Sequence, residues 1–288
     1  MGIVQSFGKL LAWRPDVVFT KGGFVCLPVG IAAKLLGIPL VIHDSDAHPG
    51  LTNRILARWA VAIGTGAPLE FYSYPSSRSF YVGIPVREEF RPRTQDEKRQ
   101  IRKSLGLSED TPLVVVTGGG LGAKRINDTL ATIGAELIKE ASVVHIAGTL
   151  QYDELRDRVP QDARYKLLSF VDNEMADILG AADLVVTRAG ATTMLELAAL
   201  AAPTIIIPNG QLTGGHQLKN AQVYANAEAA IVLEEEATVK DPRVLLTTIQ
   251  GVLRDTAASR QLSEKIHTFA MPSAAHDVAD MIVRVGQV

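Results

Sequence analysis

The chain has 288 residues, of which 47% are hydrophobic, enough to build one large domain or two packed domains. Its formal net charge of −2 excludes the strongly basic composition of a general nucleic-acid binder, so we expect no nucleic-acid partner. The single cysteine, Cys26, excludes an intrachain disulfide framework and favours a reducing compartment, and its apolar neighbours predict a buried structural thiol. No apolar run reaches the roughly 18 residues of a membrane-spanning helix.

The first residues, MGIVQSFGKLLAW, have an amphipathic pattern that predicts a short helix, and they lack the charged start and cleavage site of a signal peptide. With Lys9 and Arg14, the apolar side of this helix could contact an anionic membrane surface, or it could simply cover a sheet. These apolar residues are Ile3, Val4, Phe7, Leu10, Leu11 and Trp13.

Short β-branched runs then alternate with helix-length segments, the pattern of parallel βαβ units with right-handed crossovers. The first block has four predicted strands, at 16–20, 39–44, 61–65 and 80–83. No strand precedes its opening helix, and a parallel sheet needs covered faces and a defined edge, so we expect that the chain begins inside a domain. The polar connection from Pro85 to Arg93 has the character of a linker.

The second block has six predicted strands, at 112–118, 142–148, 165–170, 182–187, 203–208 and 229–235, with three more helices between Asp241 and Val288. This pattern predicts a doubly wound sheet. In the common order 3-2-1-4-5-6, the first and fourth strands border the crevice where ligands bind. These two strands end in the Gly-rich segments TGGGLGAKRIN (117–127) and TRAGATTMLE (187–196).

Both segments open a helix, and small residues let the first backbone amides of a helix approach an anion. The first matches neither a Walker loop nor a dinucleotide fingerprint, and it could simply be a tight strand–helix turn. Two helix starts on one crevice suit a diphosphate. Glu196, one turn inside the second helix, could accept hydrogen bonds from a ribose diol, or it could be a surface acid of the helix.

Three further groups of polar residues need an interpretation. The segment 209–222 is rich in partners for sugar hydroxyls but is a poor metal site, and His145 inside a strand predicts a hydrogen-bonded core histidine. The segment HDSDAHPGLTNR contributes two carboxylates and two imidazoles at the end of a strand, where they could form a metal site, an acid–base group, or only turns and helix caps. They are His43, Asp44, Asp46 and His48.

In combination, the segments DVVFTKGG, IPLVIHDSDAHPGLTNR, VGIPVR, VVTGGGLGAKRIN, FVDNEM, RAGATTMLELAALAAP and HQLKNA resemble the MurG family. The resemblance implies a GT-B fold, α/β with two Rossmann-like doubly wound parallel-sheet domains, of which the N-terminal one is incomplete here. It also implies an inverting transfer of N-acetylglucosamine from UDP-N-acetylglucosamine (UDP-GlcNAc) to undecaprenyl-linked lipid I, giving lipid II for peptidoglycan, cell shape and division. UDP-GlcNAc is a substrate, and neither a cofactor nor a metal is implied.

The resemblance assigns donor-site roles residue by residue. Ala191, Thr192, Thr193 and Glu196 match the segment that contacts sugar, diphosphate and ribose, with Glu196 on the ribose hydroxyls and Thr193 on a phosphate. Val171 matches the residue whose backbone reads uracil, and Arg87 matches an arginine near the diphosphate. His216 and Gln217 match the start of the sugar-binding helix. Gly119 and Gly120 match the phosphate loop. Gly120 stands where the family more often has serine.

On the acceptor side, the resemblance covers Gly22, Gly23, Asp46 and Asn53, and Asp46 stands where the family usually has asparagine. Asp44 keeps a carboxylate at the family's glutamate position and is our candidate catalytic base, with His43 and Asp46 as weaker candidates. The family's first strand and its GGTGGH-type loop are absent from this sequence.

The predicted organisation is an acceptor-side domain at 1–90, a UDP-sugar-binding domain at 91–270, and a last helix at 271–288 that crosses back to the first domain. We expect a peripheral protein on the cytoplasmic face, at the inner leaflet, of the bacterial cell membrane. Two alternatives stay open: a donor-binding subunit that is inactive without a separate N-terminal half, and a related glycosyltransferase with a different lipid or small-molecule acceptor.

Overall fold

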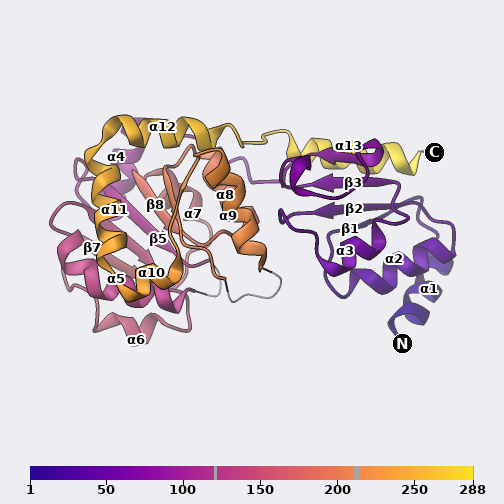
Figure 1. The fold of residues 1–288 in the computed structure, drawn as a ribbon, viewed down its shortest axis with the longest axis horizontal. Helices are drawn as coiled ribbons and strands as arrows, with labels where there is room; N and C mark the ends of the chain where they lie inside the picture. The colour runs from indigo at the N-terminus through magenta and orange to yellow at the C-terminus, as the bar shows by residue number, and fades with distance from the viewer. Residues whose placement is uncertain (120–121, 211–214, 288) are drawn as a thin grey trace. The chain divides into compact units, whose positions relative to one another are not determined.

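In the computed structural model, which describes residues 1–119, 122–210 and 215–287, the chain forms two compact units. The first unit combines Met1–Val86 with the residues from Met271 onward, and the second is Arg87–Ala270 (Figure 1). The sequence placed the boundary at residue 90, four residues later than the structure does. None of the helices in the described ranges is both long and apolar enough to cross a membrane.

The first unit is a parallel sheet of four strands in the order β1-β2-β3-β4. The strands are β1 (Val18–Thr20), β2 (Leu40–Asp44), β3 (Ala62–Thr65) and β4 (Ser79–Tyr81). The helices are α1 (Gly2–Trp13), α2 (Cys26–Leu35), α3 (Leu51–Leu56) and α13 (Ala274–Gly286), and two short 3-10 turns cover Leu69–Phe71 and Ser76–Arg78. These strands agree with the four that the sequence predicted.

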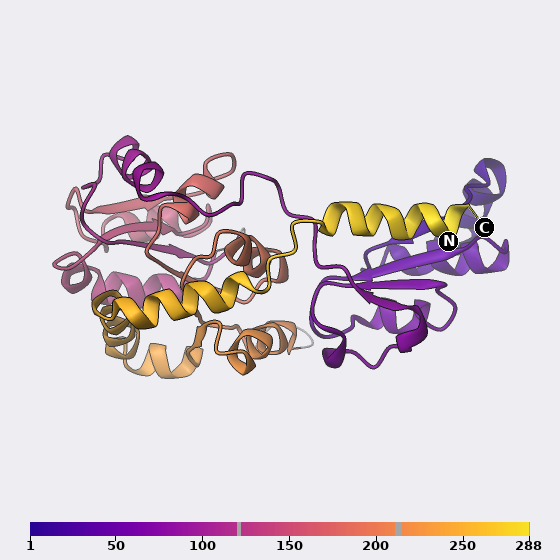
Figure 2. The same ribbon diagram turned by 90° about the horizontal axis from the view of Figure 1, so that it is seen from above.

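The two faces of this sheet have separate apolar cores because successive side chains of a strand point to opposite faces. Leu40 and Ile42 pack with Ala32 and Leu56 on the face that α2 and α3 cover. Val41, which lies between them in β2, packs with Met281 of α13 on the other face (Figures 1 and 2). The last helix of the chain is therefore one of the two layers that cover the first sheet.

The second unit is a parallel sheet of six strands in the order β10-β9-β8-β5-β6-β7. The strands are β5 (Leu113–Thr117), β6 (Ser142–Ile146), β7 (Tyr165–Leu168), β8 (Leu184–Thr187), β9 (Thr204–Ile206) and β10 (Ile231–Val232). Numbered along the block, this order is 3-2-1-4-5-6, as predicted from the sequence. The first and fourth strands, β5 and β8, are neighbours, and the chain reverses its direction of winding between them.

Helices connect these strands and cover the sheet. They are α4 (Gln95–Ser104), α5 (Lys124–Leu137), α6 (Tyr152–Arg156), α7 (Met175–Gly180), α8 (Ala191–Ala199), α9 (His216–Asn226), α10 (Glu235–Lys240), α11 (Arg243–Arg254) and α12 (Thr256–His267). On one face, α5 and α11 pack apolar residues such as Leu130 and Ile249 onto Val114 and Val186. The residues of β5 and β8 are buried throughout, as expected for central strands covered on both faces.

One predicted strand is wrong in its extent. The sequence assigned 229–235 to a strand, but the strand covers only Ile231–Val232, and Glu235 is the first residue of α10. Glu235 and Glu236 both lie in the first turn of this helix, where negative charge is favoured by the helix dipole. The difference matters because it places Glu235 at the end of the sheet that carries the predicted ligand site.

An ion pair between buried Arg102 and half-buried Asp183 attaches α4 to this sheet. Arg102 is 6% exposed, and its Nη2 donates to Asp183 Oδ2 at 2.8 Å and to the Ala181 carbonyl at 2.9 Å. Asp183 Oδ2 also accepts the Leu113 amide at 2.8 Å, at the start of β5. This pair joins α4 to the beginnings of both central strands.

Candidate functional site

The two Gly-rich turns lie side by side. Thr117 at the end of β5 is opposite Thr187 at the end of β8, so α5 and α8 begin at the same edge of the sheet. The turns share a cavity of about 450 Å³. Its lining residues are Gly118, Gly119, Gly122, Ala123, Lys124, Arg125, Thr187, Arg188, Gly190, Thr193, Asn209, Gln217 and Glu235. The predicted convergence of the two helix starts is confirmed.

The first turn requires glycine at two of its positions. A Cβ on Gly118 would lie 2.4 Å from the Ala123 nitrogen, and one on Gly122 would lie 2.6 Å from the Ala147 carbonyl oxygen. Gly122 also has a φ of +75°, and Gly119 has a φ of +78°. The backbone of this turn can therefore come close to a ligand. Gly120, predicted to contribute an amide, lies outside the described residues.

Both helix starts are suited to an anion. Neither α5 nor α8 has an acidic residue in its first turn or a side chain that caps its first amides. The first amides of a helix have no partner within the helix, and they carry partial positive charge. Lys124 and Arg125 lie in the first turn of α5, where the dipole disfavours cations. The cavity lining thus combines three cationic side chains with one carboxylate, Glu235.

Two of these cations share that carboxylate. Glu235 forms an ion pair with Arg188 through Oε1, and its Oε2 lies 3.2 Å from Arg125 Nη1. The side chains of Arg188 and Glu235 are 8% and 7% exposed. Arg188 Nη1 also donates to the Ile207 carbonyl at 2.9 Å, beyond β9. The sequence does not indicate this cluster, because the apolar run before residue 235 predicts a strand there and Arg188 belongs to a different segment.

Glu196 is half-buried on α8, one turn beyond Thr193. Its neighbours Met194, Leu195 and Leu197 are buried in the core. Burial raises the pKa of the Glu196 carboxyl, and the positive charge of Arg87 opposes that rise. The interpretation as a solvated surface acid therefore fits poorly. Arg87 itself is exposed, and its guanidinium lies 5.5 Å from the centre of the Phe90 ring.

The start of α9 brings amide groups to the same cavity. Gln217 Oε1 accepts the Asn209 amide at 2.8 Å, and both residues line the cavity. Asn220 Nδ2 donates to the Ala189 carbonyl at 2.9 Å and so attaches α9 to the turn before α8. Among the other predicted donor residues, His216 is half-buried at the first position of α9, Ala191 is half-buried, Thr192 is exposed, and Val171 is buried beyond β7.

In the first unit, Asp44 ends β2 and is 6% exposed. The Tyr74 hydroxyl donates to Asp44 Oδ2 at 2.7 Å. Burial raises the pKa of the Asp44 carboxyl to about 6, against the opposing hydrogen bonds of Tyr74 and Asn53. The Tyr72 hydroxyl donates to the Asp46 carbonyl at 2.8 Å, and the Tyr72 and Tyr74 rings stack at 5.7 Å. These two tyrosines, which the sequence did not single out, support the Asp44–Asp46 loop.

The glycine pair after β1 lies near the same loop. Gly22 and Gly23 have φ values of +85° and +80°, and a Cβ on Gly22 would lie 3.1 Å from Asn53 Nδ2. That Nδ2 donates to the His43 carbonyl at 3.1 Å, and Asn53 is 2% exposed. The predicted acceptor-side residues Gly22 and Asn53 are thus brought to the end of β2, and Asp46 is half-buried in the following loop.

His43 has the environment of a packing residue. It is 1% exposed, its Nε2 lies 2.7 Å from the Gly83 carbonyl, and its Nδ1 lies 3.4 Å from Ser45 Oγ. The carbonyl can only accept, so Nε2 carries the proton, and burial lowers the pKa of the ring. This geometry gives no support to His43 as a base. Within the described ranges, no three His, Cys, Asp or Glu side chains are gathered to hold a metal, so the metal-site reading of this segment has no geometric support.

Two predictions about single residues have clear outcomes. His145 is fully buried in β6, with Nδ1 2.8 Å from the Tyr165 hydroxyl and Nε2 2.9 Å from Asn127 Oδ1, so the prediction of a hydrogen-bonded core histidine is confirmed. Cys26 begins α2 and packs against the first core, but it is half-buried rather than fully buried.

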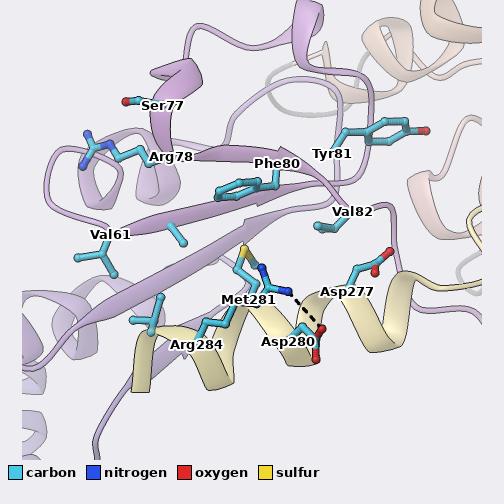
Figure 3. A pocket seen from close by; sticks show the side chains of 12 residues that line it. Val61, Ser77, Arg78, Phe80, Tyr81, Val82, Asp277, Asp280, Met281 and Arg284 are labelled. Carbon is cyan, nitrogen blue, oxygen red and sulfur yellow. Dashed lines mark ion pairs between the residues drawn. The ribbon is translucent and has the colours of Figure 1, made fainter. Parts of the chain in front are cut away.

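A separate cavity of about 440 Å³ lies in the first unit, between β4 and α13 (Figure 3). Phe80 and Met281 form part of its apolar lining, and Arg284 pairs with Asp280 at 3.7 Å along α13. None of the predicted site residues lines it. This cavity is therefore separate from the cavity of the second unit and from the Asp44 loop.

Comparisons with known proteins agree with this geometry. The sequence profile of the glycosyltransferase family 28 C-terminal domain matches residues 113–278, and that of the N-terminal domain matches residues 1–65. A UDP-N-acetylglucosamine–N-acetylmuramyl-(pentapeptide) pyrophosphoryl-undecaprenol N-acetylglucosamine transferase 2 of Bacillus cereus is 34% identical over 241 residues, which are 83% of this chain and 67% of the relative. The corresponding transferase of Clostridium kluyveri is 32% identical over 289 residues, 99% of this chain and 76% of the relative.

The chain belongs to the MurG family of glycosyltransferases. The crystal structure of MurG from Acinetobacter baumannii matches with a TM-score of 0.78 and 27% identity, over 98% of this chain and 77% of that one. Two parallel-sheet α/β units of the GT-B type are therefore shared with MurG. A UDP-GlcNAc 2-epimerase from Neisseria meningitidis matches with a TM-score of 0.70 at 11% identity, which is a likeness of fold alone.

Proposed function

We propose that this protein transfers N-acetylglucosamine from UDP-GlcNAc to undecaprenyl-linked lipid I, with inversion at the anomeric carbon and without a metal ion, to give lipid II. The observation that carries the proposal is the shared cavity of the two helix starts after β5 and β8. Its size, its cationic lining and its uncapped amides suit a nucleoside diphosphate. The family relatives, which are named for this transfer, point to the same substrates.

The chemical demand of the reaction explains the cavity. When the bond between the anomeric carbon and the β-phosphate oxygen breaks, negative charge grows on the departing UDP, and groups that stabilise this charge most strongly in the transition state accelerate the step. The amides that begin α5 and α8, the Thr193 hydroxyl and the Arg87 guanidinium would supply this stabilisation. The helix amides are fixed by the fold before the reaction, so they need little reorganisation.

The rest of the donor would be held by neighbouring elements. Glu196 would accept hydrogen bonds from the ribose diol, and its half-buried position makes such bonds stronger than they would be in water. The backbone of Val171 would read uracil. Gln217, whose Oε1 is fixed by the Asn209 amide, would present its Nε2 to the sugar hydroxyls. These assignments rest on family resemblance together with the placement of each residue.

Transfer also needs a base for the acceptor. The acceptor hydroxyl gives its proton to a carboxylate while its oxygen bonds to the anomeric carbon, and UDP leaves from the opposite face. Asp44 is our candidate because its pKa of about 6 leaves it mostly ionised at neutral pH yet able to hold a proton. Gly22, Gly23 and Asn53 lie at the same edge of the first sheet and would contribute to the acceptor site.

A lipid-linked acceptor implies contact with a membrane surface, here the inner leaflet of the cytoplasmic membrane. Helix α1 exposes Val4 (77%) and Trp13 (78%), and Lys9 is exposed on the same helix. Buried Leu10 holds the helix against α2. Vesicles containing anionic lipid should therefore retain the protein in sedimentation assays, and a Val4→Asp/Trp13→Asp double variant should release it. Equal retention of both proteins would contradict this role of α1.

A second candidate is a donor-binding subunit that acts with a separate acceptor-binding polypeptide. Strand β1 pairs only with β2 in the sheet, and the Thr20 hydroxyl, 4% exposed, has no hydrogen-bond partner within the described part of the protein. An added strand could use such an edge. Co-purification with one stable polypeptide that restores transfer would favour this candidate.

A third candidate is a glycosyltransferase with a different acceptor and an unchanged donor site.

Calorimetry and a transfer assay test the proposal in sequence. UDP-GlcNAc and UDP should bind in buffer with EDTA, and radiolabelled N-acetylglucosamine should move to lipid I in detergent micelles under the same conditions. Binding without transfer to lipid I would point to one of the two alternatives. If neither nucleotide binds, the donor-site proposal is wrong. If transfer needs a divalent cation, its metal-independent part is wrong.

A further inference from the structure

Glu235 occupies an unusual place for a carboxylate in a site built for an anion. It lies on the wall of the cavity between the two helix starts, and it is the one acidic side chain in the described lining of that cavity. Both of its oxygens are used by cations of the same wall, Oε1 by Arg188 and Oε2 by Arg125. None of the roles inferred from the family includes Glu235, Arg188 or Arg125.

The surroundings of the three side chains are unequal. Arg188 and Glu235 are almost completely buried, whereas the side chain of Arg125 is 39% exposed. Arg188 is also fixed by the Ile207 carbonyl, so it can turn little without losing that bond. Arg125 stands in the first turn of α5, next to the amides expected to meet the diphosphate. It is therefore the cation that can exchange one anionic partner for another.

A diphosphate and Glu235 offer the same chemistry to these arginines, since both present paired anionic oxygens to guanidinium groups. In the ligand-free protein the carboxylate neutralises one of the two charges. Removing one member of a buried ion pair leaves an uncompensated charge, which destabilises the protein. An anionic ligand would relieve that charge, so it should bind more tightly to a protein that lacks the carboxylate.

We propose that Glu235 is an internal counter-ion of the donor site, which competes with the diphosphate for Arg188 and Arg125 and so limits the affinity for UDP. This role rests on the proposed function, because it presumes that the cavity takes a nucleoside diphosphate. It accounts for a carboxylate at an anion site: the site must hold the donor and must also release UDP after each transfer. Glu235 thereby sets the balance between the affinity for the donor and the rate at which UDP is released.

The test compares Glu235→Gln with Glu236→Gln in the whole protein. Glu236 is the next residue of α10 and is exposed, so its variant makes the same change in net charge without touching the two arginines. Calorimetry with UDP and with uridine separates the diphosphate from the nucleoside. We expect Glu235→Gln to bind UDP about tenfold more tightly than Glu236→Gln does, with equal affinity for uridine.

Thermal unfolding provides a second readout. Glu235→Gln should melt at a lower temperature than the wild type without ligand, and UDP should raise its melting temperature by more than it raises that of the wild type. Adding Arg125→Gln to Glu235→Gln should abolish most of the gain in UDP affinity, because Arg125 is the cation that becomes available.

The outcomes separate the inference from the function on which it rests. Unchanged or weaker UDP binding by Glu235→Gln, relative to Glu236→Gln, would overturn the counter-ion role. A loss of both UDP and uridine binding would instead assign Glu235 a purely structural role, and would also overturn it. If Glu235→Gln does not fold, the UDP affinity of the single variant Arg125→Gln provides the test. An affinity higher than that of the wild type would refute the binding of the diphosphate by Arg125. A wild-type protein that binds no UDP would refute the donor-site proposal itself.

Discussion

Thr117 and Thr187 lie opposite each other at the ends of β5 and β8, and each is followed by a small-residue turn that opens a helix. This pairing is the reason that the two helix starts share one cavity, because neighbouring parallel strands deliver their connections to the same edge of a sheet. The proposed donor site of the second unit depends on this relationship.

Replacing Glu196 with alanine should weaken UDP-GlcNAc binding by about 1–3 kcal/mol, the size of hydrogen bonds to a charged group. The loss should be specific to the ribose. Calorimetry with UDP and with 2′-deoxy-UDP should therefore show a clear preference for UDP in the wild type and little preference in the variant. Glu234→Ala, which removes an exposed carboxylate, is a matched control for charge. A variant that keeps the full preference for UDP would exclude Glu196 as the ribose ligand.

Two neighbouring glycines should respond differently to alanine. At Gly118 the new methyl group would meet backbone atoms of Ala123 and Gly122 at 2.4–2.6 Å, whereas at Gly119 it would meet open space and only the positive φ is strained. We expect Gly118→Ala to lower UDP affinity at least about tenfold, because the start of α5 must move. Gly119→Ala should cost about 1 kcal/mol of stability. Equal effects of the two changes on UDP affinity would contradict this description of the turn.

The Arg102–Asp183 pair should contribute strongly to the stability of the second unit. Arg102→Met keeps the length of the side chain but removes its charged hydrogen bonds to half-buried Asp183 and to the Ala181 carbonyl, so we expect a loss of about 2 kcal/mol in urea unfolding. Arg99→Met is the control, because Arg99 lies on the same helix and its ion pairs are exposed; it should cost at most about 1 kcal/mol. A loss at Arg102 no larger than at Arg99 would show that the Arg102–Asp183 pair is dispensable for stability.

Asp44 should make stability depend on pH. Its pKa of about 6 in the folded protein lies above the ordinary aspartate value of 3.8, so the native state binds the proton more tightly than the unfolded chain does. The contribution of Asp44 therefore favours folding below pH 4 and is lost as pH rises through about 6, a change of about 3 kcal/mol. Comparing unfolding of the wild type and Asp44→Asn across this range isolates it. Asp46→Asn should weaken the pH dependence only slightly, because burial rather than the Asp46 charge is the main cause of the raised pKa of Asp44. Identical curves for all three proteins would contradict the raised pKa.

Tyr74→Phe should move the same titration in a known direction. The hydrogen bond from the Tyr74 hydroxyl favours the ionised carboxylate, so its removal should raise the pKa of Asp44 further. If Asp44 is the base, the acid limb of the pH–rate profile for kcat should shift to higher pH. Tyr72→Phe, which removes a hydroxyl bonded to the Asp46 carbonyl, should shift it less. A shift toward lower pH would be incompatible with the observed contact.

The sequence predicted the architecture well because buried parallel strands are continuous apolar runs, and residues such as Val114 and Val186 mark them plainly. The glycines of the motif also predicted where the helices begin. A side chain at Gly118 or Gly122 would clash with neighbouring backbone atoms, so these positions require glycine. Strand ends were predicted less accurately. The run AAIVLEE gives no sign that pairing stops at Val232 and that a helix begins at Glu235.

The parts of the site that could not be predicted are contacts between distant segments. Glu235 meets Arg125 across 110 residues, and Tyr74 meets Asp44 across 30, and neither pair shares a periodicity or a motif. His43 is a residue for which the motif and the contact point to different roles. An imidazole beside a carboxylate at a strand end fits a catalytic pattern, but the alternation of the strand turns it into the sheet, toward the Gly83 carbonyl.

The path of the chain has a practical consequence. The second unit is a single uninterrupted stretch, so a gene fragment for 87–270 encodes all of it. A fragment that ends at Val86 would instead leave Val41 and Ala62 without the Met281 side chain that covers them. Gly83 lies against Met271: a Cβ atom added to Gly83 would be 2.7 Å from the Met271 Cβ. A few linking residues could therefore join Val86 directly to Met271 and give the first unit as a small, independently folding protein for spectroscopy.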